Sequence, residues 1–257
     1  MKKIFLFILA AMLLMPANSR AETDFSVGAD LVSSYVWRGA FSAGASFQPT
    51  VSFTAGNFTI GSWGSMEFIG FQKEVDLFAT FAIGNFTIGL TDYWWEGEGA
   101  QNYFQFKKDA SSHWLEVNLG YSFDCGLGLS WNTMVLGSGD KYADGTDLKR
   151  AFSTYVEAGY DFSIGSVNLT AALGVSPWKS NQLYTTGYAY GEVIGVDPFT
   201  GEDIYQNNGT EGFAVTNISL KASKEISITD KFSLPIYGQL IFNPAKEDTF
   251  LVFGISF

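Results

Sequence analysis

Beyond its first 15 residues, the chain alternates between apolar and polar residues over many short segments. The segment Asp248–Phe257 shows the pattern clearly, with Leu251, Phe253, Ile255 and Phe257 on one side of an extended strand. Successive side chains of a β-strand point to opposite faces, so each such segment has an apolar face and a more polar one. A ring of such strands with lipid outside and a polar lumen inside satisfies both faces.

The composition favours an all-β fold with many turns. The chain is 47% hydrophobic and 17% aromatic, it contains 28 Gly, and only 16% of its residues are charged. No Pro- or Ser-rich linker divides it. We therefore predict one antiparallel transmembrane β-barrel of about twelve strands over residues 22–257. A soluble β-sandwich is the alternative, but it gives no reason for the ordering of connection lengths described below.

The first 21 residues predict a cleaved secretory signal peptide. Met1-Lys-Lys precedes an apolar run from Ile4 to Met15, and small residues lead up to Ala21. The run is shorter than the roughly 20 apolar residues that a spanning helix needs. Basic, apolar and small-residue regions in this order are typical of a signal removed after export.

The net charge and the cysteine content exclude some classes of protein. The formal net charge is −11, and it becomes −14 if Lys2, Lys3 and Arg20 leave with the signal, so nucleic acid is not an expected partner. The single cysteine, Cys125, cannot form an internal disulfide, and we expect it in a tight turn at 123–126. No metal-ligand cluster or cofactor motif is present in the sequence.

The alternation defines twelve expected strands, separated by connections that differ in length. Gly56-Asn57 and Gly84-Asn85 stand in a repeated Gly-Asn-Phe-Thr-Ile-Gly sequence and predict tight hairpin turns. The expected strands cover 24–38, 47–55, 58–68, 75–83, 86–95, 115–123, 127–135, 152–162, 167–175, 211–224, 231–242 and 247–257.

Short and long connections follow one another in strict alternation. The short ones are 55–57, 84–85, 124–126, 163–166 and 225–230, and the others, near 39–44, 69–72, 96–111, 137–148, 177–210 and 243–246, include several long segments. Outer-membrane barrels have short periplasmic turns and longer extracellular loops. We therefore expect both termini in the periplasm. The length of 177–210 predicts either a surface loop with a role or local disorder.

The polar face of each strand should line the lumen. Acidic residues outnumber basic ones there, which favours a narrow passage for cationic or neutral solutes. A packed interior in which Arg38 and Lys221 neutralise neighbouring acids is the other interpretation. The predicted pore-lining residues are Asp30, Arg38, Gln48, Trp63, Glu67, Asp76, Glu116, Asn118, Asn132, Tyr155, Glu157, Asp161, Asn168, Lys221, Tyr237 and Gln239.

Glu67 and Asp76 flank the connection 69–72, so we expect them to lie close together and to form the main cation filter. The test of that hypothesis is a comparison of reversal potentials in a salt gradient before and after Glu67→Gln with Asp76→Asn. An unchanged cation preference would exclude these two carboxylates as the filter.

Tryptophans near the outer strand ends suggest a membrane-interface girdle. Trp94, Trp95, Trp114 and Trp178 are the expected members, whereas the parity of Trp63 points it into the lumen. A lipid-hydrolysing barrel is a weaker alternative, because the only histidine, His113, has Leu115 where the His-x-Ser spacing of outer-membrane phospholipases requires serine.

The region from Ala29 to Trp95 resembles the TorF-type family of outer-membrane porins. The similar segments are Tyr-Val-Trp-Arg-Gly at 35–39, Gly-Ser-Trp-Gly-Ser at 61–65 and Glu-Val-Asp-Leu at 74–77. The resemblance implies a porin barrel, and it carries over to Tyr35, Arg38, Gly39, Trp63, Ser65, Glu74 and Asp76. The ending resembles the terminal strand of bacterial outer-membrane proteins, which implies recognition of Phe257 by the barrel assembly machinery.

These observations predict a porin-like channel in the outer membrane, with lipid, the assembly machinery and small solutes as its partners. The alternative is a non-conducting barrel that acts in binding or adhesion through its outer loops. Conductance in planar bilayers would separate the two hypotheses.

Overall fold

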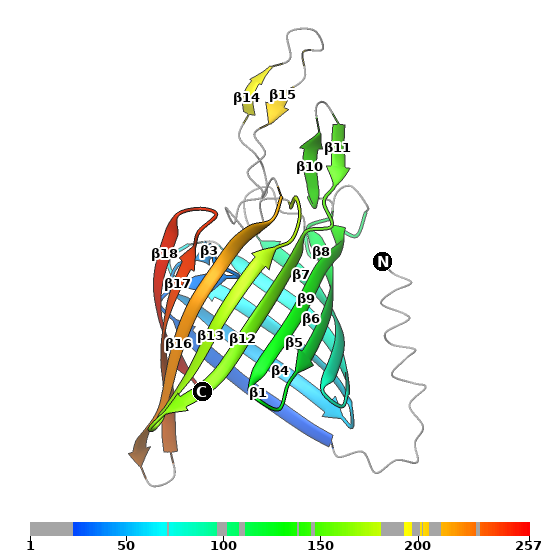
Figure 1. The fold of residues 1–257 in the computed structure, drawn as a ribbon. Helices are drawn as coiled ribbons and strands as arrows, with labels where there is room; N and C mark the ends of the chain where they lie inside the picture. Colours follow the sequence, from blue (N-terminus) through cyan, green and yellow to red (C-terminus); the bar gives the residue numbers. More distant parts are fainter. Residues whose placement is uncertain are drawn as a thin grey trace.

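The computed structural model describes residues 23–70, 72–96, 102–107, 111–137, 139–144, 147–180, 193–196, 201, 203–205, 212–229 and 232–257, so the predicted signal peptide lies outside the described residues. Twelve antiparallel strands form a closed barrel, which confirms the predicted fold class (Figure 1). In chain order they are β1 (Thr23–Val32), β4 (Ser46–Ala55), β5 (Phe58–Glu67), β6 (Lys73–Ile83), β7 (Phe86–Glu96), β8 (His113–Ser122), β9 (Leu127–Gly137), β12 (Thr154–Ile164), β13 (Val167–Ser176), β16 (Ala214–Thr229), β17 (Phe232–Asn243) and β18 (Asp248–Ser256).

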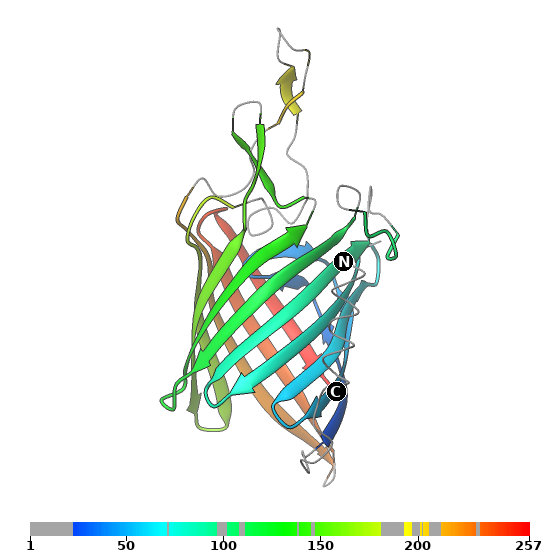
Figure 2. The ribbon, with the colours of Figure 1, turned by 90° about the vertical axis from the view of Figure 1, so that its right-hand side faces the viewer.

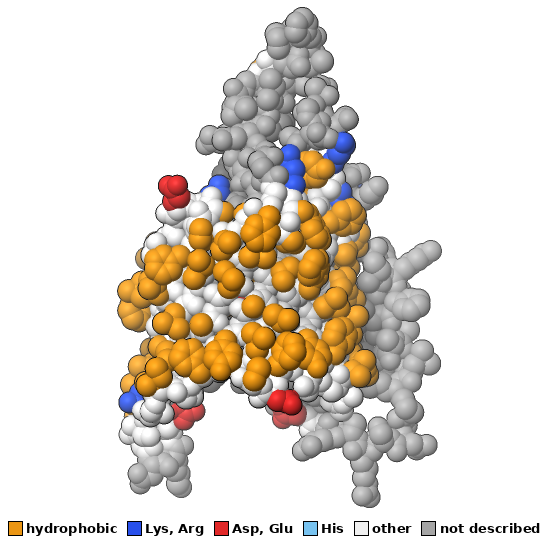
Figure 3. Space-filling view, viewed as in Figure 1, with side chains coloured by type: hydrophobic (Ala, Val, Ile, Leu, Met, Phe, Trp, Pro, Cys, Tyr) orange, Lys and Arg blue, Asp and Glu red, His pale blue; other side chains and the backbone are white. Residues whose placement is uncertain are grey.

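The alternation in the sequence becomes two chemically different surfaces of the barrel wall. Most of these strands have 9 to 12 residues, and about 9–11 tilted residues cross a bilayer. Hydrophobic side chains cover the wall in Figure 3, and the charged side chains visible there lie toward its two ends. On β18, for example, Leu251 and Phe253 are exposed, whereas the alternate residues Val252 and Gly254 are buried. The described residues contain no helix with the length and apolarity needed to cross a membrane.

The terminal strand closes the ring, as predicted. Residues Asp30–Val32 of β1 pair with Gly254–Ser256 of β18. The backbone N–H of Phe257 donates to the carbonyl of Ala29 at 2.9 Å, and the N–H of Ala29 donates to the carbonyl of Phe257 at 3.4 Å. All strands of the barrel are therefore paired on both sides, and it has no open edge.

The tight turns lie where the sequence predicts them. In both Gly-Asn turns the glycine has a positive φ, +60° at Gly56 and +57° at Gly84, while the asparagine does not. A positive φ at the first central residue alone is the pattern of a type II′ hairpin turn. Cys125 is exposed in the turn before Gly126, also as predicted. We call the end of the barrel that carries these turns the turn end and the opposite end the loop end.

The prediction of one strand over 24–38 is wrong. The first strand ends at Val32, and after a bend at Ser33–Ser34 the chain forms a small hairpin of β2 (Tyr35–Trp37) and β3 (Ala40–Ala43). Positive φ angles of 53° at Arg38 and 85° at Gly39 make its turn. Tyr35 and Trp37 continue the apolar–polar alternation of the first strand, so the sequence pattern gives no sign that the strand ends at Val32.

Two of the long connections carry hairpins where the sequence predicted irregular structure. The strands β10 (Lys141–Asp144) and β11 (Asp147–Arg150) pair, as do β14 (Val193–Val196) and β15 (Asp203–Tyr205). Figure 1 shows both pairs beyond the loop end. The strand predicted at 211–224 instead covers Ala214–Thr229, where Thr229 pairs with Phe232 of β17. The rest of 177–210 lies largely outside the described residues.

Candidate functional site

The hairpin of residues 35–43 lies inside the barrel at the level of the loop end. In Figures 1 and 2 it stays within the outline of the wall. Contacts to opposite sides of the ring define its position: the side-chain amide of Asn243 on β17 donates to the carbonyl of Gly39 at 3.0 Å, and the ring of Trp37 lies 5.5 Å from that of Tyr93 on β7. The hairpin therefore crosses the lumen rather than extending its wall.

A buried ion pair anchors the tip of the hairpin. The guanidinium of Arg38 donates from Nη1 and Nη2 to the two carboxylate oxygens of Glu116, at 2.6 Å and 2.9 Å. The side chain of Arg38 is 11% exposed and that of Glu116 is fully buried. The guanidinium also lies over the rings of Trp37 and Tyr155, at 4.4 Å and 4.8 Å. Such a two-pronged pair fixes orientation as well as charge.

Hydrogen bonds extend this anchor into the wall. Tyr93 donates its hydroxyl to Glu116 at 2.9 Å, and Asn118 donates its amide to the same carboxylate at 2.7 Å. Asn118 also donates to Asn132 at 3.0 Å. Four strands away from β8, Asn217 donates to the Tyr155 hydroxyl and to Glu157, and the Tyr155 hydroxyl donates to Glu157. The carboxylates near the hairpin tip are therefore well satisfied.

Aromatic side chains fill much of the remaining space at this level. Tyr93, Trp114 and Met134 form a buried cluster, against which Trp37 and Trp95 pack. The rings of Tyr93 and Trp95 are stacked at 5.4 Å, and those of Trp95 and Trp114 meet edge to face at 5.9 Å. The predicted interface girdle is therefore wrong for Trp95 and Trp114, which face inward because the hairpin gives them a packing surface.

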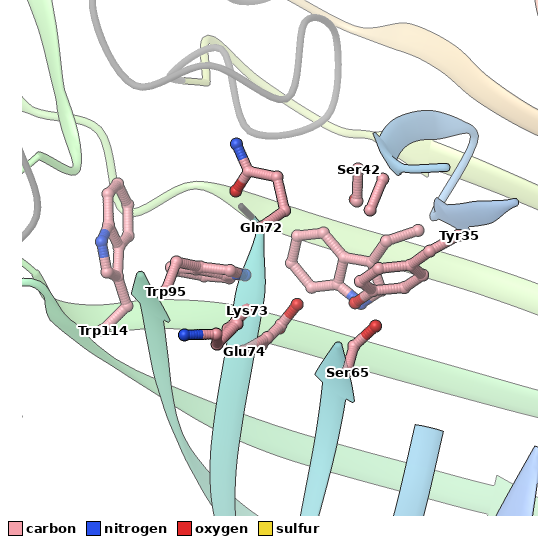
Figure 4. A pocket seen from close by; sticks show the side chains of 10 residues that line it. Tyr35, Ser42, Ser65, Gln72, Lys73, Glu74, Trp95 and Trp114 are labelled. Carbon is pink, nitrogen blue, oxygen red and sulfur yellow. The ribbon is translucent and has the colours of Figure 1, made fainter. Parts of the chain in front are cut away.

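A cavity of about 110 Å³ remains between the hairpin and the wall of β5 to β8. Figure 4 shows Trp95 and Trp114 on one side of it and Tyr35 on the other, with Glu74 between them. Glu74 is 4% exposed and lies beside the Tyr35 hydroxyl, the Trp95 indole and the Asp76 carboxylate. The remaining lining residues are Trp37, Ser42, Ala43, Ser65, Gln72 and Lys73.

The lumen near the turn end is built differently. We call it the turn half, and the hairpin level the loop half. Pairs such as Thr54 with Thr59 (2.9 Å) and Asp161 with Thr170 (2.6 Å) hydrogen bond across neighbouring strands. Asp161 is exposed although it shares the inward face. The strand registers place small and polar residues on this part of the face, namely Thr54, Thr59, Thr80, Thr87, Gly120, Gly128, Asp161, Asn168 and Thr170.

The predicted pore-lining residues share one face of the barrel. Register pairs join Asp30 to Gln48, Trp63 to Asp76, and Asn118 to Asn132, and the Lys221 ammonium lies 3.9 Å from the Tyr237 ring. Arg38 also reaches the lumen, but from the hairpin rather than from the wall. The members in contact with the hairpin or its anchoring network are Arg38, Trp63, Glu67, Glu116, Asn118, Asn132, Tyr155 and Glu157, and those on the rest of the face are Asp30, Gln48, Asp76, Asp161, Asn168, Lys221, Tyr237 and Gln239.

The predicted proximity of Glu67 and Asp76 is wrong. Asp76 lies opposite Trp63 in the register, and Glu67 is four residues further along β5, about 13 Å at the rise of a strand. The carboxylate of Glu67 instead accepts the backbone N–H of Gly44 at 2.7 Å and so holds the base of the hairpin. The carboxylate next to Asp76 is that of Glu74.

Glu74, Tyr93, Trp95 and Trp114 are large inward residues of the loop half that the predicted pore-lining set does not include. Glu74 has the same parity as Asp76, so its position could have been found by starting that strand two residues earlier. Of the residues carried over from the resemblance, Tyr35, Ser65 and Glu74 line the cavity, and the Trp63 ring contacts that of Tyr35 at 5.4 Å.

His113 lies on the outer side of the wall, and both nitrogens of its ring have hydrogen-bond partners. Its Nδ1 is 2.9 Å from Asp92 and its Nε2 is 2.5 Å from the carbonyl oxygen of Tyr103, so both ring nitrogens are engaged. Tyr103 and Phe106 pack on the imidazole. In the described ranges no three His, Cys, Asp or Glu side chains are grouped closely enough to hold a metal ion.

Comparisons with known proteins give similarity of structure alone. No family model and no curated protein matches the sequence. Among solved structures, the chain is similar to a protein from a study of the in-meso crystallization of membrane proteins (8% identity, TM-score 0.43, covering 92% of this chain and 83% of that one). It is also similar to the CymD monoaromatic hydrocarbon channel (9% identity, TM-score 0.44, covering 96% of this chain and 91% of that one). A third similar structure is the Salmonella typhi outer membrane phospholipase (OMPLA) dimer with bound calcium (12% identity, TM-score 0.33, covering 97% of this chain and 94% of that one). At these identities the assignment as a closed barrel of twelve strands rests on the strand order of the chain itself.

Proposed function

We propose that the protein is an outer-membrane channel for the passive diffusion of small solutes, with the β2–β3 hairpin as its constriction. The observation that carries the proposal is the hairpin in the lumen, anchored through the buried pair of Arg38 and Glu116. A loop that only covered the end of the barrel would not need a buried ion pair inside the lumen, so this anchor supports a constriction within the barrel. The turn half beyond the hairpin is lined with small polar side chains, as suits an aqueous passage.

The barrel wall supports the membrane location. An even number of strands, an apolar exterior and an alternation of short and long connections are together typical of bacterial outer-membrane barrels. In this orientation the turn end faces the periplasm and the loop end faces outward. The constriction then lies near the outer mouth, where a solute first meets it.

The charges of the lumen favour cationic or neutral solutes. On the inward face, Arg38 is paired with Glu116 and Lys221 lies on the ring of Tyr237. The acidic side chains of that face are more numerous: Asp30, Glu67, Glu74, Asp76, Glu116, Glu157 and Asp161. In a narrow passage their combined field concentrates cations and repels anions.

The test is conductance in planar bilayers, with a variant that lacks the constriction. Residues 34–44 are replaced by a Gly-Asn linker, and Glu116→Gln in the same chain removes the charge that would lose its partner. We expect small, cation-preferring conductance from the parent protein and a several-fold larger conductance from the variant. A control shortened at 143–148, in the β10–β11 hairpin, should conduct like the parent.

The same measurement separates the channel from its alternatives. A parent protein and a hairpin variant that are both electrically silent would favour a binding or adhesion protein acting through its loops. Lipid hydrolysis has less support, because the His113 ring nitrogens are engaged by Asp92 and a backbone carbonyl rather than by a serine. Release of fatty acid from phospholipid vesicles by the purified protein would contradict the proposed channel-only function.

A further inference from the structure

Two neighbouring inward carboxylates stand out at the level of the hairpin: Glu74, which lines the cavity, and Asp76, which lies beside Glu74. Glu74 and Asp76 are 4% and 6% exposed. Glu74 Oε1 and Asp76 Oδ1 are buried and have no hydrogen-bond partner among the described residues. A buried carboxylate oxygen without a donor is unfavourable, because it has lost its hydration without replacement. The pair therefore has unused capacity to accept hydrogen bonds.

The surroundings supply further negative charge rather than a cation. The charged side chains that act most strongly on Asp76 are Glu74, Asp92 and Glu116. The guanidinium of Arg38 is engaged by Glu116. Lys73 also borders the cavity, but its ammonium is paired with Glu96 at 2.8 Å. A positively charged group that entered the cavity would meet Glu74 at the wall, with Asp76 beside it, while Arg38 and Lys73 keep their own partners.

The aromatic walls of the cavity can contact both the charge and the carbon atoms of an organic cation. Tyr35, Trp37, Trp95 and Trp114 line it. Aromatic faces attract a cation within about 6 Å, and tryptophan does so best. The same rings accept an aliphatic chain by burying its apolar surface. The volume of about 110 Å³ exceeds that of several water molecules, since each needs on the order of 10–15 Å³ by this measure.

We propose that this cavity binds a small primary ammonium ion, with its N–H groups on the Glu74 carboxylate and its carbon chain between the aromatic rings, while the neighbouring Asp76 carboxylate adds negative charge. A primary ammonium fits better than a quaternary one because the unpartnered Glu74 oxygen requires a donor, which a quaternary nitrogen lacks. The inference deepens the proposed function by naming a solute class for the constriction. Binding is nevertheless measurable whether or not the barrel conducts.

The experiment titrates the detergent-purified full chain with n-butylammonium and follows tryptophan fluorescence and heat of binding. Tetramethylammonium carries the charge without N–H donors, and n-butanol carries the chain without the charge. We expect n-butylammonium to bind and the two other compounds to bind much more weakly. Equal binding of all three, or no binding of n-butylammonium, would overturn the proposal using the parent protein alone.

Variants locate the site. Glu74→Gln should weaken n-butylammonium binding by about tenfold or more, as expected for loss of a charge-assisted hydrogen bond. Asp76→Asn removes only a neighbouring charge, so it should weaken binding in the same direction but less. Glu96→Gln is the matched control, because Glu96 is a nearby carboxylate on the outer side of the wall, and it should bind like the parent. If Glu96→Gln weakened n-butylammonium binding as much as Glu74→Gln does, the result would overturn the proposed site and favour general electrostatic attraction. Conductance without binding would contradict this site but not the channel, and binding by a silent barrel would contradict the channel but not the site.

Discussion

The loop half and the turn half of the lumen are formed by the same strands but are lined in different ways. The loop half holds a hairpin, a cluster of large aromatic rings and a buried ion pair. The turn half presents threonine, glycine, asparagine and an exposed aspartate. A barrel of one circumference can therefore be narrow at one level and open at another, because side-chain volume and an inserted segment determine the free space.

This difference separates the tasks of the two halves. Interactions in the loop half are buried and mutually dependent, so single changes there should affect stability and passage together. Those in the turn half are exposed to the lumen, where water can replace a lost contact. The comparison can be tested by matched substitutions in both halves.

The largest effect on stability is expected from Arg38→Met. This change keeps an unbranched apolar stem but leaves the fully buried Glu116 without its cation, which typically costs about 3–5 kcal/mol. Urea unfolding in lipid vesicles measures the loss. The double variant with Glu116→Met should recover much of the stability, and a double variant as unstable as the single one would show that the charge of Glu116 is not the cause.

The next largest loss of stability is expected from Gly39→Ala. At this position φ is +85°, and a Cβ would lie 1.8 Å from the carbonyl oxygen of Thr216, so the hairpin tip would have to move off β16. Gly84→Ala is the control in the turn half, since its φ is +57° but nothing lies within 4 Å of the added atom. The free energy of unfolding of this control should fall by only about 1–2 kcal/mol, which is the cost of placing a residue with a Cβ in the left-handed backbone conformation. Gly39→Ala should lose more and should also change conductance, and equal losses would contradict the close packing of the tip.

Lys221→Met tests the turn half directly. The ammonium lies 3.9 Å from the Tyr237 ring centroid, and a contact of this kind is worth about 0.5–2 kcal/mol. We expect a loss within that range in the same unfolding assay, together with a slightly stronger preference for cations because a positive charge is removed. A loss as large as that of Arg38→Met would remove the distinction between the halves.

The smallest effect is expected outside the lumen. Lys73 and Glu96 pair at 2.8 Å with side chains 51% and 46% exposed. Exposed pairs contribute about 0–1 kcal/mol, so Lys73→Met should leave the unfolding midpoint almost unchanged. A clear destabilisation would mean that Lys73 also supports the cavity that its neighbour Glu74 lines.

The sequence predicts the barrel well because lipid and lumen separate alternate residues along every strand. Leu251 and Val252, for instance, could be assigned to opposite faces without any knowledge of their neighbours. The constriction could not be predicted in this way, because Tyr35 and Trp37 alternate whether they continue a wall strand or turn into the lumen. Trp95 and Trp114 were misassigned for a related reason: an aromatic residue near a strand end suits a membrane interface, and only the inserted hairpin makes the inward face preferable.

The contact of Asn243 with the carbonyl of Gly39 spans 204 residues and has a consequence for the order of assembly. The hairpin follows the first strand in the chain, yet its partners include residues of β8, β12, β16 and β17, so the full set is in place only when the barrel is nearly complete. Contacts of such long sequence separation form late, after the loop between them has closed. The lumen of a newly closed barrel should therefore be at its widest, and seating of the hairpin is the step that narrows it.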